Sequence, residues 1–326
     1  MFSIPYSRYI FEPLPWYSFL IVTGAALAVF LACREERRTA LPKDTVIDLA
    51  LWVLPFGIIG ARLYYVIFSW SSFRNDLPSI FRIWEGGLAI YGGLIAGLAV
   101  LLVFCRIRRL PALRVCDIIV PGVALAQCLG RWGNYFNIEA YGLTVTDPAF
   151  CFFPFAVQVP TDGYAWHLAT FFYESIWDFA VFLFLMLNRR KRLIRPGDVF
   201  FFYLFLYAAG RLVIEEFRLD SLYAGSSVRI SQLLSVLVCT ALLIRYLLLL
   251  RRNIKNKLPM LMLLILSMTA SVLALAYALT GYLPFERVPG IVVLYLGSYA
   301  LLMIVSLFFL VLPHSVREAS HADNRT

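Results

Sequence analysis

The sequence predicts an all-α membrane protein, a polytopic bundle of transmembrane helices, and two observations support this prediction. Apolar residues make up 61% of the 326 residues, the mean hydropathy is +0.78, and only 15% of residues are charged. Soluble domains carry about 25% charged residues, so we infer that the main solvent of this chain is a bilayer. In addition, nine stretches are each apolar over roughly 20 residues, the length that crosses a hydrocarbon core of about 30 Å.

The nine predicted spans follow one another along the chain. They lie near residues 15–33, 47–69, 86–105, 115–131, 168–188, 198–216, 229–250, 258–281 and 289–312. The fourth span is short, and the sixth ends in charged residues. Four spans begin after Gly or Pro, which often end or begin helices, at Pro111, Pro196-Gly197, Pro259 and Pro289-Gly290. Residues 132–167, between the fourth and fifth spans, are predicted to form an arm or lid outside the membrane.

The basic residues predict how these spans are oriented. If the spans alternate in direction, 20 of the 29 Lys and Arg residues fall on one side, in clusters at 34–43, 106–114, 189–195 and 245–257 and in the tail. Cytoplasmic loops carry such an excess, so the N-terminus is predicted to lie outside and the C-terminus in the cytoplasm. The net charge of +9 therefore reflects topology, and we expect membrane lipids but no nucleic acid as partners.

Several kinds of site are not expected from the sequence. The N-terminus lacks the basic start, apolar core and cleavage site of a signal peptide, so we expect the first span to stay in the mature protein. The six cysteines occur singly, without CxxC spacing, and predict neither disulfides nor a metal site. The chain has no P-loop, GxSxG, HExxH or dinucleotide-binding motif, so we expect no cofactor.

Arginines inside the predicted spans indicate where the chemistry lies, because an arginine at the bilayer centre costs roughly 2.5–3.5 kcal/mol. Arg62, Arg131 and Arg211 fall at one depth, toward the outer ends of their spans. Tyr91 lies near the outer end of the third span. We therefore expect these side chains at a similar level in the bilayer.

The end of the sixth span predicts a polar pocket that opens toward the outer leaflet. Arg211, Glu215 and Arg218 lie at i, i+4 and i+7 and share one helix face, whereas Glu216 points elsewhere. We expect three arginines and one carboxylate to line this pocket and to give it a net positive charge. Such a pocket suits an anionic lipid headgroup, because a planar guanidinium binds phosphate oxygens in a bidentate way.

Structural interpretations of the same residues stay open. Arg218 could be an interfacial arginine that reaches into headgroups, Tyr91 could belong to an aromatic belt, and His167 could have a hydrogen-bonded structural role. The arginines of the second, fourth and sixth spans could instead pair with Glu139, Glu174 and Glu215. A lipid or anion transporter is disfavoured by the lack of internal repeats and by the off-centre depth of the arginines.

The thirteen residues 130–142, GRWGNYFNIEAYG, closely resemble the signature of the prolipoprotein diacylglyceryl transferases, GR-x-GN-[FY]-x-N-x-E-x-x-G. Supporting matches occur in order: Trp16-Tyr17, Gly60-Ala61-Arg62, Trp84-Glu85-Gly86-Gly87, Tyr91-Gly92-Gly93-Leu94-Ile95, Phe172-Tyr173-Glu174, and Arg211 with Glu215, Phe217 and Arg218. A non-catalytic scaffold would not explain this pattern. The resemblance covers about residues 10–250, essentially the seven-span fold of that family.

This resemblance implies three segments and one activity. The segments are a seven-span transferase core at 1–257 with the outward loop 132–167, two additional spans at 258–313, and a cytoplasmic tail at 314–326. Members of the family act in the bacterial cytoplasmic membrane, in the first step of lipoprotein maturation. They move the diacylglyceryl group of phosphatidylglycerol to the lipobox cysteine thiol of a prolipoprotein signal peptide, forming a thioether and releasing glycerol phosphate.

The resemblance also implies roles for individual residues. Arg131 and Arg211 are expected to hold the phosphate and to stabilise the leaving charge, and Glu215 is expected to orient Arg211. Tyr91 stands where some members have a histidine that is proposed as the base, and a phenol with a pKa near 10 is a poor base at neutral pH. The element around His167 and the two additional spans also depart from the family pattern. The residues expected to bind substrate are Arg62, Asn134, Asn137, Glu139, Gly142, Gly92, Gly93, Arg218 and Tyr17.

Overall fold

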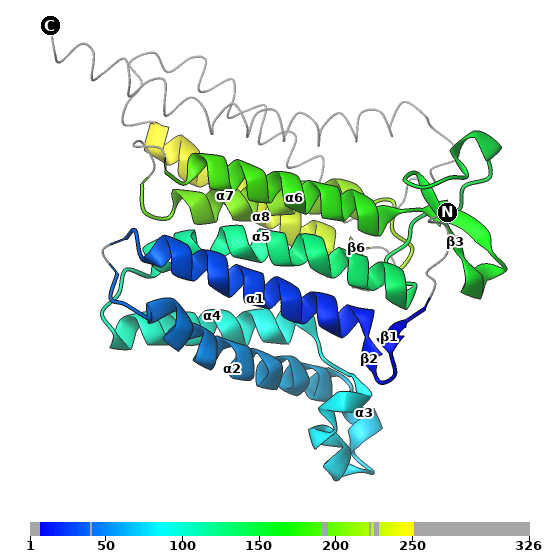
Figure 1. The fold of residues 1–326 in the computed structure, drawn as a ribbon, viewed down its shortest axis with the longest axis horizontal. Helices are drawn as coiled ribbons and strands as arrows, with labels where there is room; N and C mark the ends of the chain where they lie inside the picture. Colours follow the sequence, from blue (N-terminus) through cyan, green and yellow to red (C-terminus); the bar gives the residue numbers. More distant parts are fainter. Residues whose placement is uncertain (1–6, 40, 191–194, 222, 225–227, 251–326) are drawn as a thin grey trace, which may run out of the picture. The chain divides into compact units, whose positions relative to one another are not determined.

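The computed structural model describes residues 7–39, 41–190, 195–221, 223–224 and 228–250 (Figure 1). The predicted spans at 258–281 and 289–312 and the predicted tail lie outside these residues. The chain divides into two compact units, one formed by residues 25–122 and the other by the residues before and after that segment. Helices α1 (Trp16–Glu36) and α5 (Ala112–Asn137) each contribute to both units.

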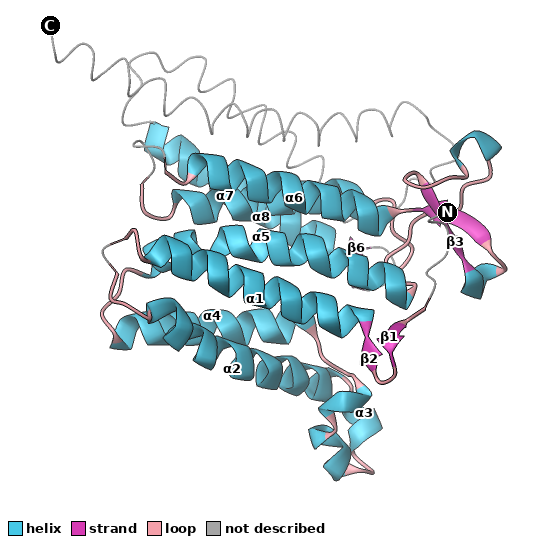
Figure 2. Ribbon diagram, viewed as in Figure 1, coloured by secondary structure: helices cyan, strands magenta, loops and turns pink. Residues whose placement is uncertain are grey.

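Most of the described residues are helical (Figure 2). Within the described residues, five helices are long and apolar enough to cross a membrane: α1, α2 (Thr45–Phe68), α4 (Ile90–Ile107), α5 and α6 (Thr170–Asn188). Two more long helices, α7 (Asp198–Glu215) and α8 (Ile230–Leu250), coincide with the predicted spans at 198–216 and 229–250. The prediction of a polytopic membrane helix bundle is confirmed at this level.

Two borders differ from the predicted spans. Helix α5 continues from Ala112 to Asn137, so the fourth predicted span is not short and the outward loop begins after Asn137 rather than at 132. Hydropathy falls at the polar residues of the signature, but the helical backbone continues through them. Helix α4 begins at Ile90 rather than near 86, because Gly86 and Gly87 have positive φ angles of 93° and 73°, which do not fit a right-handed helix.

Short strands and turns accompany the helices, and the prediction of a purely helical chain did not include them. The antiparallel pairs are β1 (Tyr9–Phe11) with β2 (Leu14–Pro15), β3 (Ala156–Val159) with β4 (Ala165–Leu168), and β5 (Tyr223–Ala224) with β6 (Val228–Arg229). Short helical segments are α3 (Trp70–Phe73), η1 (Leu77–Phe81), η2 (Ile83–Glu85), η3 (Pro148–Phe150) and η4 (Pro160–Asp162). The β3–β4 hairpin has its residues in direct register, with Val157 opposite His167.

In the unit of residues 25–122, α2 and α4 lie side by side and pack through small residues (Figure 1). A Cβ atom at Gly60 would collide with Ala96 and with the backbone of Gly92. A Cβ atom at Gly92 would likewise collide with the backbone of Gly60. Small residues let helix backbones approach closely in a membrane. This contact places the first turn of α4, where Tyr91 lies, against α2.

Glu36 organises the other end of this unit. It is the last residue of α1, and its buried carboxylate accepts hydrogen bonds from the backbone N–H groups of Thr45 at 3.0 Å and Val46 at 3.1 Å. The first N–H groups of a helix have no partner within the helix, so a carboxylate is stabilising there. Glu36 therefore ties the end of α1 to the start of α2.

In the other unit, α7 packs against both α6 and α8. Gly210 of α7 faces Trp177 of α6, and a Cβ atom at Gly210 would collide with the indole ring. The indole Nε1 donates a hydrogen bond to the Leu206 carbonyl oxygen at 2.9 Å. This close approach brings Arg211, the next residue of α7, next to α6.

Candidate functional site

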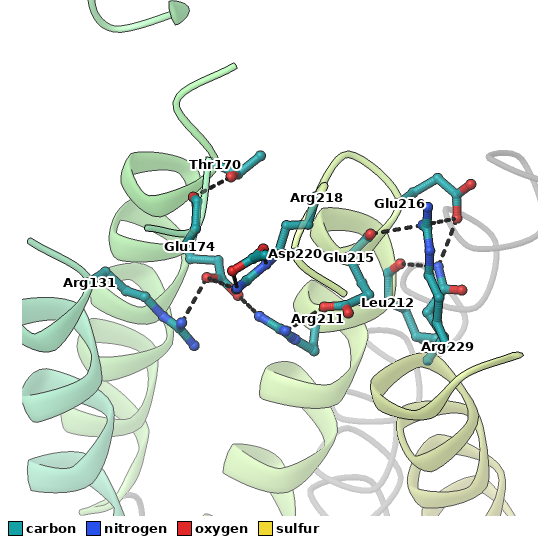
Figure 3. A network of polar contacts seen from close by, with 12 residues as sticks. Arg131, Thr170, Glu174, Arg211, Leu212, Glu215, Glu216, Arg218, Asp220 and Arg229 are labelled. Atoms are coloured by element: carbon teal, nitrogen blue, oxygen red, sulfur yellow. Dashed lines mark hydrogen bonds and ion pairs between the residues drawn. The ribbon is translucent and has the colours of Figure 1, made fainter. Parts of the chain in front are cut away.

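The main polar cluster surrounds Glu174, in the second turn of α6 (Figure 3). Three arginines from different parts of the chain contact its carboxylate. Arg131 Nη1, near the end of α5, lies 3.0 Å from Glu174 Oε2, and Arg218 Nη1, just after α7, lies 3.2 Å from the same oxygen. Arg211 of α7 contacts Oε1. The fold thus brings Arg131, Arg211 and Arg218 together, whereas Arg62, which the sequence grouped with Arg131 and Arg211, belongs to the unit of residues 25–122.

Burial differs among these side chains. The side chains of Glu174 and Glu215 are 5% and 0% exposed, whereas those of Arg131 and Arg211 are 18% and 15% exposed. A buried carboxylate is costly unless it is paired, and the guanidinium groups provide that pairing. Because each guanidinium carries five N–H donors, Arg131 and Arg211 can hold Glu174 and still present donors to a ligand.

Two more carboxylates hold the arginines of α7 and the residues after it. Glu215 forms an ion pair with Arg211 across one helical turn. Arg218 donates from Nε and Nη2 to the two oxygens of Asp220, at 2.9 and 2.7 Å. The structural pairing that the sequence left open is therefore confirmed for Arg211 with Glu215 and for Arg131 with Glu174.

Asp178 is a member of this cluster that the sequence interpretation missed. Its Oδ2 atom lies 3.9 Å from Arg131 Nε and accepts no hydrogen bond from the described part of the chain. Asp178 follows Glu174 by four positions, so both carboxylates lie on one face of α6, and this spacing could have revealed it. Four carboxylates thus contact these three arginines, whereas the sequence predicted one carboxylate.

Glu216 lies away from Glu174 and belongs to a second network, as its predicted direction implies (Figure 3). Its carboxylate accepts a hydrogen bond from Gln232 Nε2 at 2.8 Å and lies 3.2 Å from Arg229 Nη1. Arg229 also donates to the backbone carbonyl oxygen of Glu215 at 2.9 Å. Arg229 and Gln232, which connect the start of α8 to the end of α7, were not predicted as site residues from the sequence.

The signature residues end α5 and reverse the chain. Ile138 and Ala140 have positive φ angles of 59° and 56°, so the helix cannot continue beyond Asn137. The Glu139 N–H donates to the Asn134 carbonyl oxygen at 2.9 Å, and Asn134 Nδ2 lies 3.3 Å from Glu139 Oε2. Asn137 Oδ1 is buried and accepts no hydrogen bond from the described residues. The three polar residues thus occupy one turn, and their role in headgroup binding stays a prediction.

Gly142 connects this turn to the arginine cluster. It forms an antiparallel β-bridge with Arg218, and its N–H donates to the Leu168 carbonyl oxygen at 2.8 Å. A Cβ atom at Gly142 would lie 2.6 Å from the Phe217 carbonyl oxygen and 2.8 Å from Thr170 Cγ2. No larger residue fits without displacing the backbone beside Arg218, so glycine is required here for packing.

His167 of β4 has a hydrogen-bonded structural role, one of the interpretations left open above. It is 1% exposed, with Nδ1 2.9 Å from the Gly142 carbonyl oxygen and Nε2 2.8 Å from Asp162 Oδ2. Each ring nitrogen thus lies within hydrogen-bonding distance of one oxygen atom. His167 therefore supports the backbone of Gly142 from within the hairpin.

Tyr17 packs against the signature helix. A Cβ atom at Gly133 would lie 2.7 Å from Tyr17 Cδ2, so this glycine makes room for the ring. The neighbouring Trp16 stacks on Phe136 with ring centres 5.0 Å apart. The start of α1 is thus held against the part of α5 that contains Arg131.

The remaining predicted site residues belong to the unit of residues 25–122. Gly92 and Gly93 lie in the packing contact with α2, and Tyr91 is half-buried in the first turn of α4. The guanidinium group of Arg62 donates to backbone carbonyl groups of the chain after α2. The predicted roles of these residues in catalysis or substrate binding stay predictions.

Comparison with known proteins gives this geometry a family context. The family model of prolipoprotein diacylglyceryl transferases matches residues 8–248. A phosphatidylglycerol–prolipoprotein diacylglyceryl transferase of Streptococcus equi subsp. zooepidemicus is 46% identical over 226 residues, which cover 69% of this chain and 86% of that protein. An enzyme of the same name from Limosilactobacillus reuteri is 44% identical over 246 residues, covering 73% of this chain and 87% of that protein. The predicted resemblance and its extent are confirmed.

Proposed function

This chain belongs to the prolipoprotein diacylglyceryl transferase family, and we propose that it transfers the diacylglyceryl group of phosphatidylglycerol to a prolipoprotein. The acceptor is the thiol of the lipobox cysteine in the signal peptide of the prolipoprotein. A thioether bond forms between the cysteine sulfur and a glyceryl carbon, and glycerol phosphate leaves with the electrons of the broken C–O bond. This reaction is the first step of lipoprotein maturation.

The observation that carries this proposal is the meeting of three arginines at Glu174. They come from α5, from α7 and from the residue stretch after α7, and two of them are partly exposed. A fixed set of guanidinium groups at one point is suited to a phosphodiester, whose oxygens accept paired hydrogen bonds from each planar fork. We therefore assign phosphate binding to Arg131 and Arg211, with Arg218 at the edge of the same cluster.

These arginines assist both halves of the reaction. As the C–O bond breaks, negative charge grows on the departing phosphate, and donors held in place before the reaction stabilise that charge without reorganising. The same positive charges favour the thiolate over the thiol, and the thiolate is the nucleophile. Glu174 and Glu215 position the arginines rather than react, since their carboxylates are buried behind the guanidinium groups.

The signature turn forms the rest of the proposed headgroup site. Asn134, Asn137 and Glu139 offer amide and carboxylate groups that suit the glycerol hydroxyls of phosphatidylglycerol. Gly142 keeps the backbone close to Arg218, because a side chain there would collide with Phe217. Tyr17, Gly92 and Gly93 complete the set that we assign to substrate binding by family resemblance, whereas the N–H donors of Arg62 face backbone carbonyl oxygens.

Tyr91 is assigned to the thiol substrate. It occupies the position where some members of the family have a histidine, at the start of α4. We propose that its hydroxyl positions the substrate by hydrogen bonding and that the arginines provide most of the stabilisation of the thiolate.

We also propose a topology. Residues 1–257 form a seven-span transferase core with its outward loop within 132–167, residues 258–313 add two spans, and residues 314–326 form a cytoplasmic tail. The family match ends at residue 248, which supports treating the later residues as an addition to the core. The basic clusters favour a topology with the N-terminus outside, the C-terminus in the cytoplasm and the arginine cluster toward the outer leaflet of the bacterial cytoplasmic membrane.

The test is direct. Purified protein is incubated with phosphatidylglycerol vesicles and a synthetic lipobox peptide, and the peptide is analysed by mass spectrometry. We expect a mass gain equal to one diacylglyceryl group on the cysteine. A peptide with Ser in place of that cysteine and vesicles of phosphatidylcholine alone are the controls, and both should show no gain. Unmodified cysteine peptide with an inserted, folded protein would overturn the proposed reaction.

A further inference from the structure

The segment between α2 and α4 exposes large apolar side chains that the proposed reaction does not explain. We call residues 77–90 the apolar loop. Phe81 is 78% exposed and Trp84 is 77% exposed. Other large exposed side chains of this loop are Leu77, Ile83, Leu88 and Ile90. Exposed apolar groups gathered on one short segment indicate an interaction surface.

Arg62, near the end of α2, holds the apolar loop in shape. The residue is only 7% exposed, and all five of its guanidinium N–H donors face backbone carbonyl oxygens of the loop. These acceptors, at 2.6 to 3.4 Å, belong to Ser79, Ile80, Arg82, Gly86 and Gly87. The guanidinium carbon also lies 5.2 Å from the centre of the Phe73 ring. A single buried cation thus ties several turns of the loop to α2.

Two glycines allow the chain to pass around this guanidinium group. Gly86 and Gly87 have φ angles of 93° and 73°, which side-chain-bearing residues rarely adopt. A Cβ atom at Gly87 would also lie 2.5 Å from Arg62 Nη1. The loop is therefore built around Arg62, and its apolar side chains project from a defined backbone.

We expect the ends of the loop at the membrane surface, because both helices that it joins are candidate membrane spans. Helices α2 and α4 are both candidate membrane spans, they pack side by side, and the loop joins the last turn of one to the first turn of the other. Both helices expose large apolar side chains, such as Leu63 at 53% and Leu94 at 62%. The exposed aromatic residues of the loop continue that apolar surface to the level of the headgroups, where aromatic side chains are enriched in membrane proteins.

We propose that the apolar loop is an interfacial anchor that inserts Phe81 and Trp84 between the headgroups and acyl chains of the adjoining leaflet. Arg62 keeps the loop in the conformation that presents these two side chains. Lipid is favoured over a peptide partner, because α2 and α4 hold the loop at the bilayer whether or not a peptide is bound. This role goes beyond the proposed transfer reaction and does not depend on it.

The test measures how deep the loop lies in the membrane. The two half-buried cysteines, Cys33 and Cys151, are replaced by serine, and the other four are buried. Single nitroxide labels are then attached to Phe81→Cys, Trp84→Cys and Asn75→Cys proteins in full-length form in phosphatidylglycerol-containing vesicles. Electron paramagnetic resonance compares collisions with oxygen, which concentrates in lipid, and with a water-soluble nickel complex.

The anchor predicts oxygen-dominated collisions at positions 81 and 84 and nickel-dominated collisions at the exposed polar position 75. A label at Leu63→Cys, on the exposed surface of α2, provides the reference ratio of oxygen to nickel collisions for a side chain in the hydrocarbon core. Nickel-dominated collisions at both 81 and 84 would overturn the proposal. Nickel-dominated collisions that become protected only when a lipobox peptide is added would also overturn it, in favour of a peptide-docking surface.

The role of Arg62 is tested with the same labels. In Arg62→Gln protein we expect a more mobile spectrum at position 84 and a loss of its oxygen-dominated reading. Gly87→Ala disturbs the same contact without removing a charge, so this variant is measured in place of Arg62→Gln if that protein does not insert. An unchanged depth and mobility at position 84 in the inserted variant would overturn the role of Arg62.

Discussion

Replacement of Glu174 by glutamine removes one negative charge from the centre of the arginine cluster and leaves the shape of the side chain almost unchanged. The Glu174 side chain is 5% exposed and contacts Arg131, Arg211 and Arg218. Removing one partner of a buried ion pair costs about 3–5 kcal/mol, because the remaining charges lose their compensation. Glutamine keeps one oxygen acceptor, and Glu215 still pairs with Arg211. We therefore expect Glu174→Gln to lower the free energy of unfolding by about 3 kcal/mol, at the lower end of that range.

Thermal unfolding in lipid nanodiscs measures this loss and connects it to phosphate binding. In phosphatidylcholine alone, Glu174→Gln protein should unfold at a lower temperature than the wild type. In phosphatidylglycerol, the headgroup phosphate of a bound lipid supplies a negative charge beside Arg131 and Arg211. The free energy of unfolding should therefore increase more for the variant than for the wild type. A ligand present at 100 times its Kd stabilises the folded state by about 2.7 kcal/mol, enough to recover most of the loss.

Asp48→Asn is the matched control for this experiment. Asp48 Oδ2 lies 2.8 Å from Arg108 Nη2 in an exposed ion pair, with side chains 38% and 58% exposed. Removing such a pair costs about 0–1 kcal/mol, and no dependence on phosphatidylglycerol is expected beyond that of the wild type. If Glu174→Gln protein unfolded at the same temperature as the wild type in phosphatidylcholine, the central role of this carboxylate would be refuted. No increase in the free energy of unfolding of either protein in phosphatidylglycerol would refute phosphate binding beside the arginines.

The other predictions concern turnover, measured with the lipobox peptide assay. Arg131→Ala and Arg211→Ala should each abolish transfer in inserted protein, and Lys at either position should restore little activity because it lacks the planar fork. Arg108→Ala should stay active as an exposed control. Full activity in Arg131→Ala or Arg211→Ala protein would remove phosphate binding from that residue. Tyr91→Phe should slow transfer by about 10-fold to 100-fold, the loss of one hydrogen bond to a charged group, and Tyr91→His should keep activity that rises with pH through about 6.5; a wild-type rate for Tyr91→Phe at all pH values would return Tyr91 to the aromatic belt. Protein truncated after Lys257 should retain activity, and an inserted but inactive truncation would show that residues 258–326 contribute to the site.

The positions of the helices could be predicted well because the membrane sets them. A span needs a minimum length of apolar residues, so hydropathy locates α1, α2, α4, α5 and α6 to within a few residues. The same measure placed the end of α5 too early, since the signature residues after Arg131 are polar but remain helical. Hydropathy reports the surroundings of a side chain. The end of the helix is instead set by the backbone φ angles, which are positive at Ile138 and Ala140, just after Asn137.

Partners within one helix could be predicted from spacing, and partners on different helices could not. Glu215 and Arg211 lie four residues apart on α7, so their ion pair follows from helix geometry. The pairing of Arg131 with Glu174 depends on how α5 and α6 are rotated about their axes. Packing between the helices sets this rotation, and the periodicity of a single helix carries no information about it. Asp178 is a different case, because its spacing of four residues from Glu174 on α6 could have revealed it.

Arg62 shows a further limit of arguing from depth. Its level along α2 matched that of Arg131 and Arg211, so the sequence grouped all three as one class of buried cation. The depth of an arginine indicates the free energy cost of burying its charge, but it does not say which acceptor groups compensate for that cost. For Arg62 the acceptors are backbone carbonyl oxygens, which every residue carries, so no pattern of residue types can reveal them. The one sequence feature that bears on them is Gly86-Gly87, because only glycine lets the chain turn back with its carbonyl groups facing the guanidinium group.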